Sequence, residues 1–135
     1  MRVVRRAAAL AVLVALLLAY GVAIEPRLVL DHRRYTAEIP GLAPGREGMQ
    51  VAVFADLQTG MWWANGGMVE RIVARVVRDR PDVVLIPGDF LYSSDPSVAK
   101  QVQAVMEQLA PLVESGIPTY AVMGNHDNAW AVPRR

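Results

Sequence analysis

The sequence predicts an α/β fold in which parallel strands are joined by crossover helices, preceded by an N-terminal transmembrane helix. Short runs of branched apolar residues alternate with segments of helical periodicity from residue 50 onward. Residues 7–24 form an apolar run without any charge. The chain has 135 residues in all, which is enough for one ordinary domain at most.

Residues 1–24 are predicted to be a signal anchor or transmembrane segment. At roughly 1.5 Å per residue, the apolar run nearly spans a hydrocarbon core of about 30 Å. Arg2, Arg5 and Arg6 precede the run, so we expect a single-pass membrane protein with a cytoplasmic N-terminus and its domain outside. The alternative is an export signal that is cleaved near Gly21–Ala23, giving a secreted protein.

Residues 25–49 are predicted to be a linker that contains one edge strand. The segment is interrupted by Pro26, Pro40 and Pro44 and by glycines. Between these breaks, residues 35–39 alternate apolar and polar side chains, which favours a strand.

Residues 50–135 are expected to form the domain itself. Its first strand, "MQVAVFAD", ends in Asp56. A helix follows over residues 65–80, with Asn65 as its N-cap and Pro81 ending it. Its apolar stripe has helical spacing and consists of Val69, Ile72, Val73, Val76 and Val77.

A second strand, helix and third strand complete the pattern. "PDVVLIPGD" has four consecutive branched residues, which predicts a strand buried on both faces and ending in Asp89. The next helix begins with Asp95 as cap and Pro96 at its first position, and a bend or break is expected before Pro111. Its predicted stripe is Val98, Val102, Val105, Leu109 and Leu112. The third strand is "IPTYAVMGNHD".

Polar side chains follow the end of each predicted strand. They are Asp56, Asp89 and the cluster Asn125, His126 and Asp127. The carboxyl ends of parallel strands meet at one edge of a sheet, so these side chains should lie close together. Carboxylates that approach one another need a cation between them, and these donors with imidazole suit Mn, Fe or Zn. A carboxylate on the middle strand, Asp89, is placed to bridge two ions.

The composition excludes several other kinds of site. The chain has no cysteine, which rules out disulfides, thiolate nucleophiles and zinc–thiolate sites. Lys plus Arg number 14 and Asp plus Glu number 13, a net charge of +1, and no long basic tract is present. We therefore expect no nucleic-acid partner.

Three motifs, "FADLQ", "PGDF" and "GNHD", resemble the first three motifs of the calcineurin-like metallophosphoesterase superfamily. The anchor followed by "IEPRLVLDHRRYTAEIP" is similar to the membrane-associated bacterial branch of that family. The resemblance implies that residues 50–135 are a partial metallophosphoesterase domain, the N-terminal half of an αββα sandwich. It also implies hydrolysis of a phosphoester, for which the anchor makes a lipid-linked substrate attractive.

The resemblance implies a role for each candidate residue at two divalent metal ions. Asp56 and Gln58 would bind the first ion, Asp89 would bridge both, and Asn125 would bind the second. The catalytic pair would be His126, as general acid or charge stabiliser beside the phosphate, and Asp127, which would orient the His126 ring.

Two departures from the family pattern leave alternatives open. The first motif of the family reads Asp-x-His, but residue 58 is Gln, and no histidine follows His126 to supply the downstream metal ligands. One alternative is a non-catalytic relative that kept the fold without a complete site. The other is an aspartyl-phosphate phosphatase with Asp56 as nucleophile, which fits poorly because Gln58 stands where a second acid is needed and Lys100 falls inside a helix.

Overall fold

The computed structural model describes residues 2–61, 66–92 and 98–128. The chain divides into two compact units, Met1–His32 and Arg33–Arg135. Each unit is described by itself below. The predicted caps Asn65, Asp95 and Pro96 lie outside the described residues.

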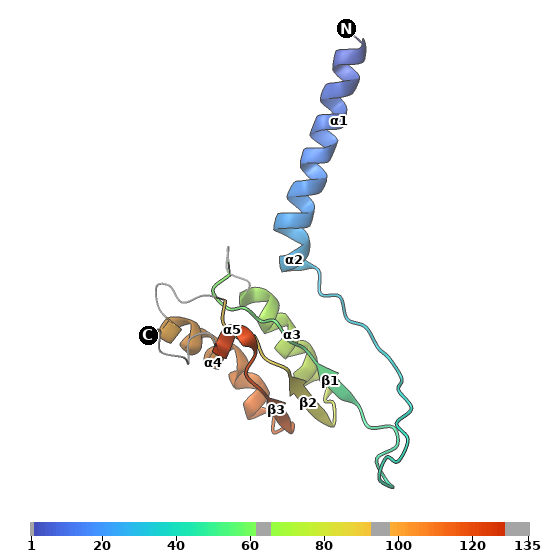
Figure 1. The fold of residues 1–135 in the computed structure, drawn as a ribbon, viewed down its shortest axis with the longest axis vertical. Helices are drawn as coiled ribbons and strands as arrows, with labels where there is room; N and C mark the ends of the chain where they lie inside the picture. The colour runs from blue at the N-terminus through green and yellow to red at the C-terminus, as the bar shows by residue number, and fades with distance from the viewer. Residues whose placement is uncertain (1, 62–65, 93–97, 129–135) are drawn as a thin grey trace. The chain divides into compact units, whose positions relative to one another are not determined.

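The first unit is a long apolar helix. The α-helix α1 (Arg2–Ala19) continues through a π-helical turn (Tyr20–Ile24) into the short helix α2 (Glu25–Leu28) (Figure 1). Residues Arg2–Ile24 are long and apolar enough to cross a membrane, with a mean hydropathy of 2.6, and none of that span is buried. A signal sequence would have the same length and composition.

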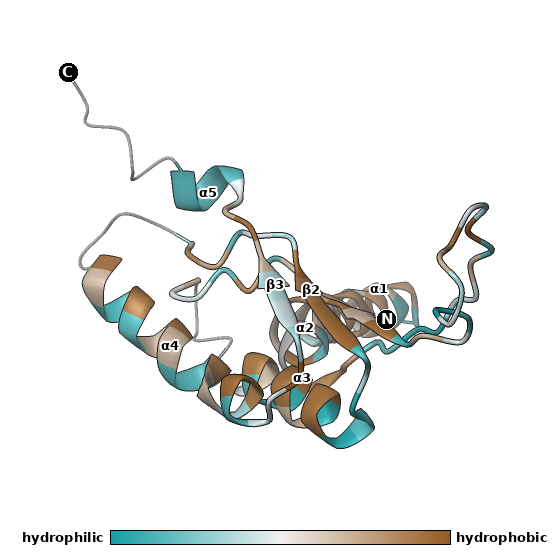
Figure 2. Ribbon diagram, turned by 90° about the horizontal axis from the view of Figure 1, so that it is seen from below, coloured by the Kyte–Doolittle hydropathy of each residue, from teal (hydrophilic) through white to brown (hydrophobic). Residues whose placement is uncertain are grey.

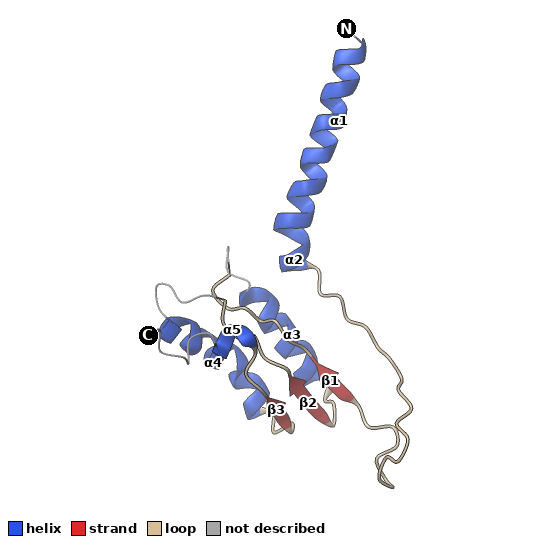
Figure 3. Cartoon of the chain, viewed as in Figure 1, coloured by secondary structure: helices blue, strands red, loops and turns tan. Residues whose placement is uncertain are grey.

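The segment that follows is irregular as far as the first strand (tan in Figure 3). The predicted edge strand at residues 35–39 is wrong, because these residues form no strand, and both Tyr35 and Ile39 are exposed. An extended segment becomes a strand only when a neighbour completes its backbone hydrogen bonds, and alternation of side chains cannot supply that neighbour.

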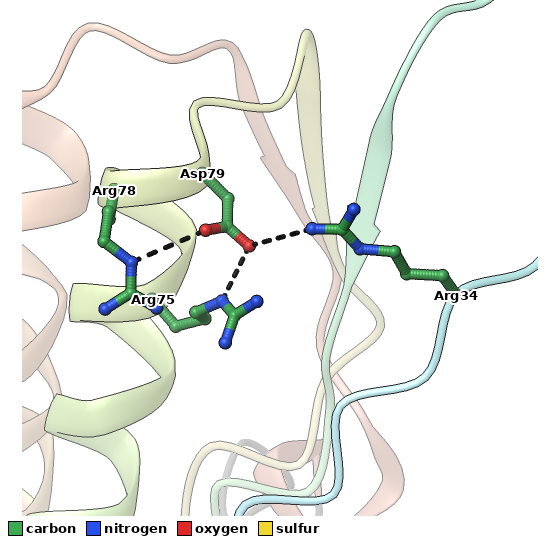
Figure 4. Close-up of polar contacts among 4 residues, drawn as sticks. All are labelled: Arg34, Arg75, Arg78 and Asp79. Carbon is green, nitrogen blue, oxygen red and sulfur yellow. Dashed lines mark hydrogen bonds and ion pairs between the residues drawn. The ribbon is translucent and has the colours of Figure 1, made fainter.

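A cluster of ion pairs connects this segment to the C-terminal end of the helix α3 (Gly66–Asp79) (Figure 4). The carboxylate of Asp79 receives a 2.7 Å hydrogen bond from Nε of Arg75, and it lies 3.6 Å from Nε of Arg78 and 3.7 Å from a guanidinium nitrogen of Arg34. The Arg75 hydrogen bond, aided by the charges of the three arginines and opposed by slight burial, lowers the pKa of Asp79.

Within the residues that the structure describes, the domain is built on three parallel strands, as predicted. The strands β1 (Val51–Val53), β2 (Val83–Ile86) and β3 (Thr119–Ala121) lie in the order β1-β2-β3. Their register pairs Val53 with Leu85 and Leu85 with Tyr120. All three are shorter than the sequence suggested, because the residues that carry the candidate ligands belong to the loops that follow them.

The helices α3 (Gly66–Asp79) and α4 (Val98–Glu114) pack side by side (Figure 1). The core between them and the sheet holds Leu57, Val69, Val73, Val76, Val84, Ile86, Leu112 and Ile117. The stripe predicted for α3 is confirmed, since three of its valines are buried and Ile72 and Val77 pack against the core. In α4 the prediction is wrong at Val102, which is exposed, while Gln101 is buried in its place.

The expected break before Pro111 is absent, because α4 runs unbroken to Glu114. Proline lacks an N–H and so removes one helical hydrogen bond. Leu109 and Leu112, on either side of it, pack into the core, and Leu112 is almost fully buried. Their packing stabilises the helix enough to offset the hydrogen bond that is lost at Pro111. Figure 2 shows the resulting mixture of hydrophobic and hydrophilic residues along α4.

The middle strand is buried on one face, not on two as predicted. Val84 and Ile86 are buried against the helices, but Leu85 between them is 38% exposed. Its register partners Val53 and Tyr120 are 61% and 65% exposed. Both helices pack against the face that carries Val84 and Ile86, and the row on the other face is exposed.

Candidate metal centre

The loops after β1 and β2 run side by side and are joined by backbone hydrogen bonds. Asp56 N–H donates to Gly88 O at 3.2 Å, and Gln58 N–H donates to Asp89 O at 2.9 Å. Thr59 continues this pairing with the same loop, where it forms a parallel bridge with Leu91. The pairing extends the β1–β2 ladder beyond the strands and sets the first two candidate motifs next to each other.

The loop after β3 touches the loop after β2 through two glycines. A Cβ placed on Gly88 would overlap the Gly124 nitrogen and lie 2.6 Å from its Cα. A Cβ on Gly124 would overlap Oδ1 of Asp89 and lie 2.5 Å from the Asp89 nitrogen. Glycine at both positions therefore permits a backbone approach that no other residue allows. The contact brings the "GNHD" segment to the same edge of the sheet as Asp89.

The backbone at the candidate ligands is strained. Among the described residues, four residues other than glycine have positive φ, and three of them are Asp56 (55°), Gln58 (41°) and Asp89 (58°). This left-handed conformation costs about 1–2 kcal/mol for an ordinary residue such as Gln58, and less for an aspartate. The fourth, Arg80, directly follows α3, where such a conformation commonly ends a helix. Strain of this kind gathers at functional sites, and here it coincides with the predicted metal ligands.

Asp127 is the most deeply buried acid near these loops, with 3% of its surface exposed. It belongs to the short helix α5 (Asn125–Asn128), which is hydrophilic throughout (teal in Figure 2). Its carboxylate accepts hydrogen bonds from four backbone N–H groups, those of Asp89, Phe90, Leu91 and Gly124. Among the described contacts it makes no hydrogen bond to the His126 ring, so the predicted orienting role remains a prediction.

Asp89 in turn contacts the backbone of α5. Its Oδ1 accepts a hydrogen bond from His126 N–H at 2.9 Å. Within the described residues, Oδ2 of Asp89 accepts no hydrogen bond and is free to serve a ligand. Asp56 and Asn125 are exposed, and Gln58, Asp89 and His126 are partly exposed, so solvent can reach every predicted metal ligand.

The donors fit a divalent ion in kind but fall short in number. Asp56, Gln58, Asp89 and Asn125 offer carboxylate and amide oxygens, which hard divalent ions accept. The described residues contain no group of three or more His, Cys, Asp or Glu side chains that could hold a metal. Two ions with about five or six ligands each need more donors than these four side chains provide.

Sequence reasoning did not predict the two glutamines of α4 that hydrogen-bond to the loops after β1 and β2. The buried Gln101 of α4 accepts a hydrogen bond from Tyr92 N–H at 3.3 Å, and Thr59 Oγ1 donates to Gln108 at 3.4 Å. The signal was present in the sequence, because Gln101 and Gln108 are in line with Val105 and Leu112 at helical spacing. The two glutamines thus belong to the face that α4 turns toward the domain.

Comparison with known proteins identifies the family. The sequence profile described as calcineurin-like phosphoesterase matches residues 49–135. The chain is 36% identical over 65 residues to a protein of Arabidopsis thaliana named "Probable inactive purple acid phosphatase 28". The aligned residues make up 47% of this chain and 16% of that protein. It is 38% identical over 55 residues to the DNA double-strand break repair protein Mre11 of Methanococcus maripaludis. This alignment covers 41% of this chain and 14% of that protein.

A solved structure is similar as well. The crystal structure of a dimetal phosphatase from Danio rerio aligns with a TM-score of 0.44 and 18% identity, over 58% of this chain and 29% of that one. The chain spans about a seventh to a sixth of the length of the curated relatives it matches. The family profile matches well over half of the chain, and on that ground the chain belongs to the calcineurin-like phosphoesterase family.

Proposed function

We propose that the chain is the membrane-anchored N-terminal half of a metal-dependent phosphoester hydrolase. The observation that carries the proposal is the joining of three strand-end loops at one edge of the sheet, with left-handed backbone at Asp56, Gln58 and Asp89. Family membership supports the reaction class. The number of donors supports the view that further ligands come from a second half.

Each candidate residue has a defined part in this proposal. Asp56 and Gln58 would hold one ion, Asp89 both ions and Asn125 the other. When bound, the ions would supply charge neutralisation for the attacking and leaving oxygens of the phosphoester. His126 would stand beside the phosphate as a proton donor or charge stabiliser. The anchor favours a substrate at the membrane, such as a lipid-linked phosphoester.

A non-catalytic relative is the second candidate. Gln58 in place of a histidine and the shortage of donors both favour it, because an amide binds transition metals more weakly than imidazole does. Two of the similar relatives in Arabidopsis thaliana carry the word inactive in their names. The two candidates differ in whether metal is bound.

Metal binding by the full chain in detergent decides between them. Asp89→Asn is the variant to compare, because asparagine tolerates positive φ and its amide oxygen still accepts the His126 N–H bond. Asp79→Asn is the matched control, since Asp79 lies on α3 and contacts arginines instead. Manganese that binds the wild type and the control but at least tenfold more weakly to Asp89→Asn supports the hydrolase. Failure of the wild type to bind manganese, iron or zinc, both by itself and when the proposed second half is supplied, would favour the non-catalytic relative.

Turnover is tested separately with p-nitrophenyl phosphate and its bis-ester, which report monoester and diester hydrolysis. Metal-dependent release that is lost in Asp89→Asn supports the proposed reaction. Stoichiometric metal binding without release from either ester would contradict hydrolysis by this chain alone.

A further inference from the structure

The carboxylate of Asp127 holds the loop that carries Asp89. Its Oδ2 accepts from the N–H groups of Asp89 and Gly124, both at 2.9 Å, and its Oδ1 accepts from Phe90 at 2.9 Å and Leu91 at 3.1 Å. Three of the four donors lie 36 to 38 residues earlier in the chain. One side chain thus ties together the loops after β2 and β3.

This hydrogen-bond set uses the whole capacity of an ionised carboxylate. A carboxylate has about four lone-pair sites, and all of them are filled by backbone donors here. An amide in its place would turn an NH₂ group toward two N–H groups, and donors cannot satisfy donors. Asparagine is therefore a poor replacement at this position although its shape is nearly the same.

The contacts between Asp127 and Asp89 are reciprocal. The Asp127 side chain accepts from the Asp89 backbone, and the Asp89 side chain accepts from the backbone of His126, next to Asp127. The first bond fixes the left-handed peptide at Asp89, whose φ is 58°. The second fixes Oδ1 of Asp89, which leaves Oδ2 as the oxygen that can face a ligand.

We propose that Asp127 is a positioning residue that acts on Asp89 through the backbone, and that it does not act through the His126 ring. The part of this proposal that concerns metal rests on the proposed function, and the part that concerns the loop does not. Through its hydrogen bonds to the loop, the Asp127 carboxylate fixes the orientation of the Asp89 carboxylate before a metal ion binds.

The loop is tested first on the metal-free full chain in detergent, by amide hydrogen exchange. The four amides that Asp127 accepts from should exchange slowly in the wild type although none belongs to a strand or helix. In Asp127→Asn all four should lose protection while amides of α3 keep theirs. Fast exchange of the four amides in the wild type would overturn the proposal without any variant, so a variant that fails to fold does not leave the question open.

Manganese affinity is tested next, with two comparison variants. Groups that orient a metal ligand typically account for about 10–100-fold in metal affinity, so Asp127→Asn should bind manganese weaker by that factor. Asp82→Asn is the matched control, because Asp82 also accepts a backbone N–H, that of Gln50 at 2.7 Å, but just before β2 at the opposite end of that strand. It should bind manganese as the wild type does.

His126→Ala separates the two roles of Asp127. If Asp127 acts through the backbone, His126→Ala keeps both the slow amides and the manganese affinity. If Asp127→Asn leaves amide exchange and manganese affinity unchanged and lowers only ester hydrolysis, the ring-orienting role is correct and this proposal is overturned. A wild type that binds no manganese, with or without the proposed second half, would defeat the proposed function, while the exchange experiment would still decide the role of Asp127 in the loop.

Discussion

The contact between Gly88 and Gly124 gives the sharpest prediction about the fold of the site. We compare Gly88→Ala with Gly116→Ala, because both glycines have positive φ, 102° and 71°, but differ in their surroundings. A Cβ on Gly116 meets no atom within 4 Å. A Cβ on Gly88 meets backbone atoms of Gly124 and Met123, which no side-chain rotation can move away.

The expected magnitudes follow from these contacts. For Gly116→Ala the left-handed conformation costs about 1–2 kcal/mol, and the stiffer unfolded chain returns about 0.4–1 kcal/mol, a net loss near 1 kcal/mol. Gly88→Ala bears at least this cost, because a φ of 102° lies beyond the left-handed α region. It must also move the two loops apart by roughly 1 Å to reach an ordinary carbon–carbon separation. That movement breaks hydrogen bonds to Asp127, so the total loss should be about 3–5 kcal/mol.

The assay is urea unfolding of the full chain in mild detergent, followed by circular dichroism, with thermal melting as a second measurement. Each kcal/mol corresponds to about 4–8 °C in a domain of this size. We expect Gly116→Ala to melt within about 8 °C of the wild type and Gly88→Ala at least about 12 °C below it. If the two variants unfold within about 1 kcal/mol of each other, the inferred backbone contact between the loops is incorrect.

Three further predictions concern single side chains. At Asp56, with φ of 55°, Asp56→Gly should be more stable than Asp56→Ala by about 1 kcal/mol, measured by urea unfolding; the opposite order would argue against the strained backbone. Because the pKa of Asp79 is lowered, its stabilising effect is complete above about pH 4 and disappears as the pH falls through that lowered pKa. The unfolding free-energy difference between wild type and Asp79→Asn should therefore vanish in acid, and a difference that stays constant from pH 2 to 6 would contradict this. The chain has no cysteine, so Lys100→Cys on α4 introduces a single site for labelling. If the domain lies outside the cytoplasm, a membrane-impermeant maleimide should label this cysteine in intact spheroplasts. Labelling only after lysis would show the opposite orientation.

The sequence was sufficient for the order of the elements because that order depends on local patterns. Alternation of branched runs with helical stripes leads to parallel strands, and the described part of the structure has three of them in the order β1-β2-β3. The edge strand at residues 35–39 failed for the opposite reason. Its pattern is local, but a strand depends on a distant partner that the pattern does not contain.

The predicted site residues were accessible to sequence reasoning, but their support was not. Asp56, Asp89 and Asn125 could be proposed as site residues because each follows an apolar run, and the structure brings their loops to one edge of the sheet. The four backbone bonds of Asp127 and the contact between two glycines depend on how close the loops come, and periodicity carries no information about that distance. The buried Gln101 was partly predictable, because its helical spacing indicates the inward face of α4 but not its hydrogen bond with the Tyr92 N–H.

A second sheet would account both for the exposed sheet face and for the shortage of metal donors. Val53, Leu85 and Tyr120 are register partners and form an apolar row across all three strands, although parallel sheets are normally covered on both faces. A second sheet packed on this row, as the αββα sandwich predicts, would bury it at about 25 cal/mol per Å² and bring further ligands to the same edge. Ligands from another layer can complete a metal site only if the donors of the first layer already stand in place. The hydrogen bonds of Asp127 and the contact between the two glycines supply that order from residues of this chain alone.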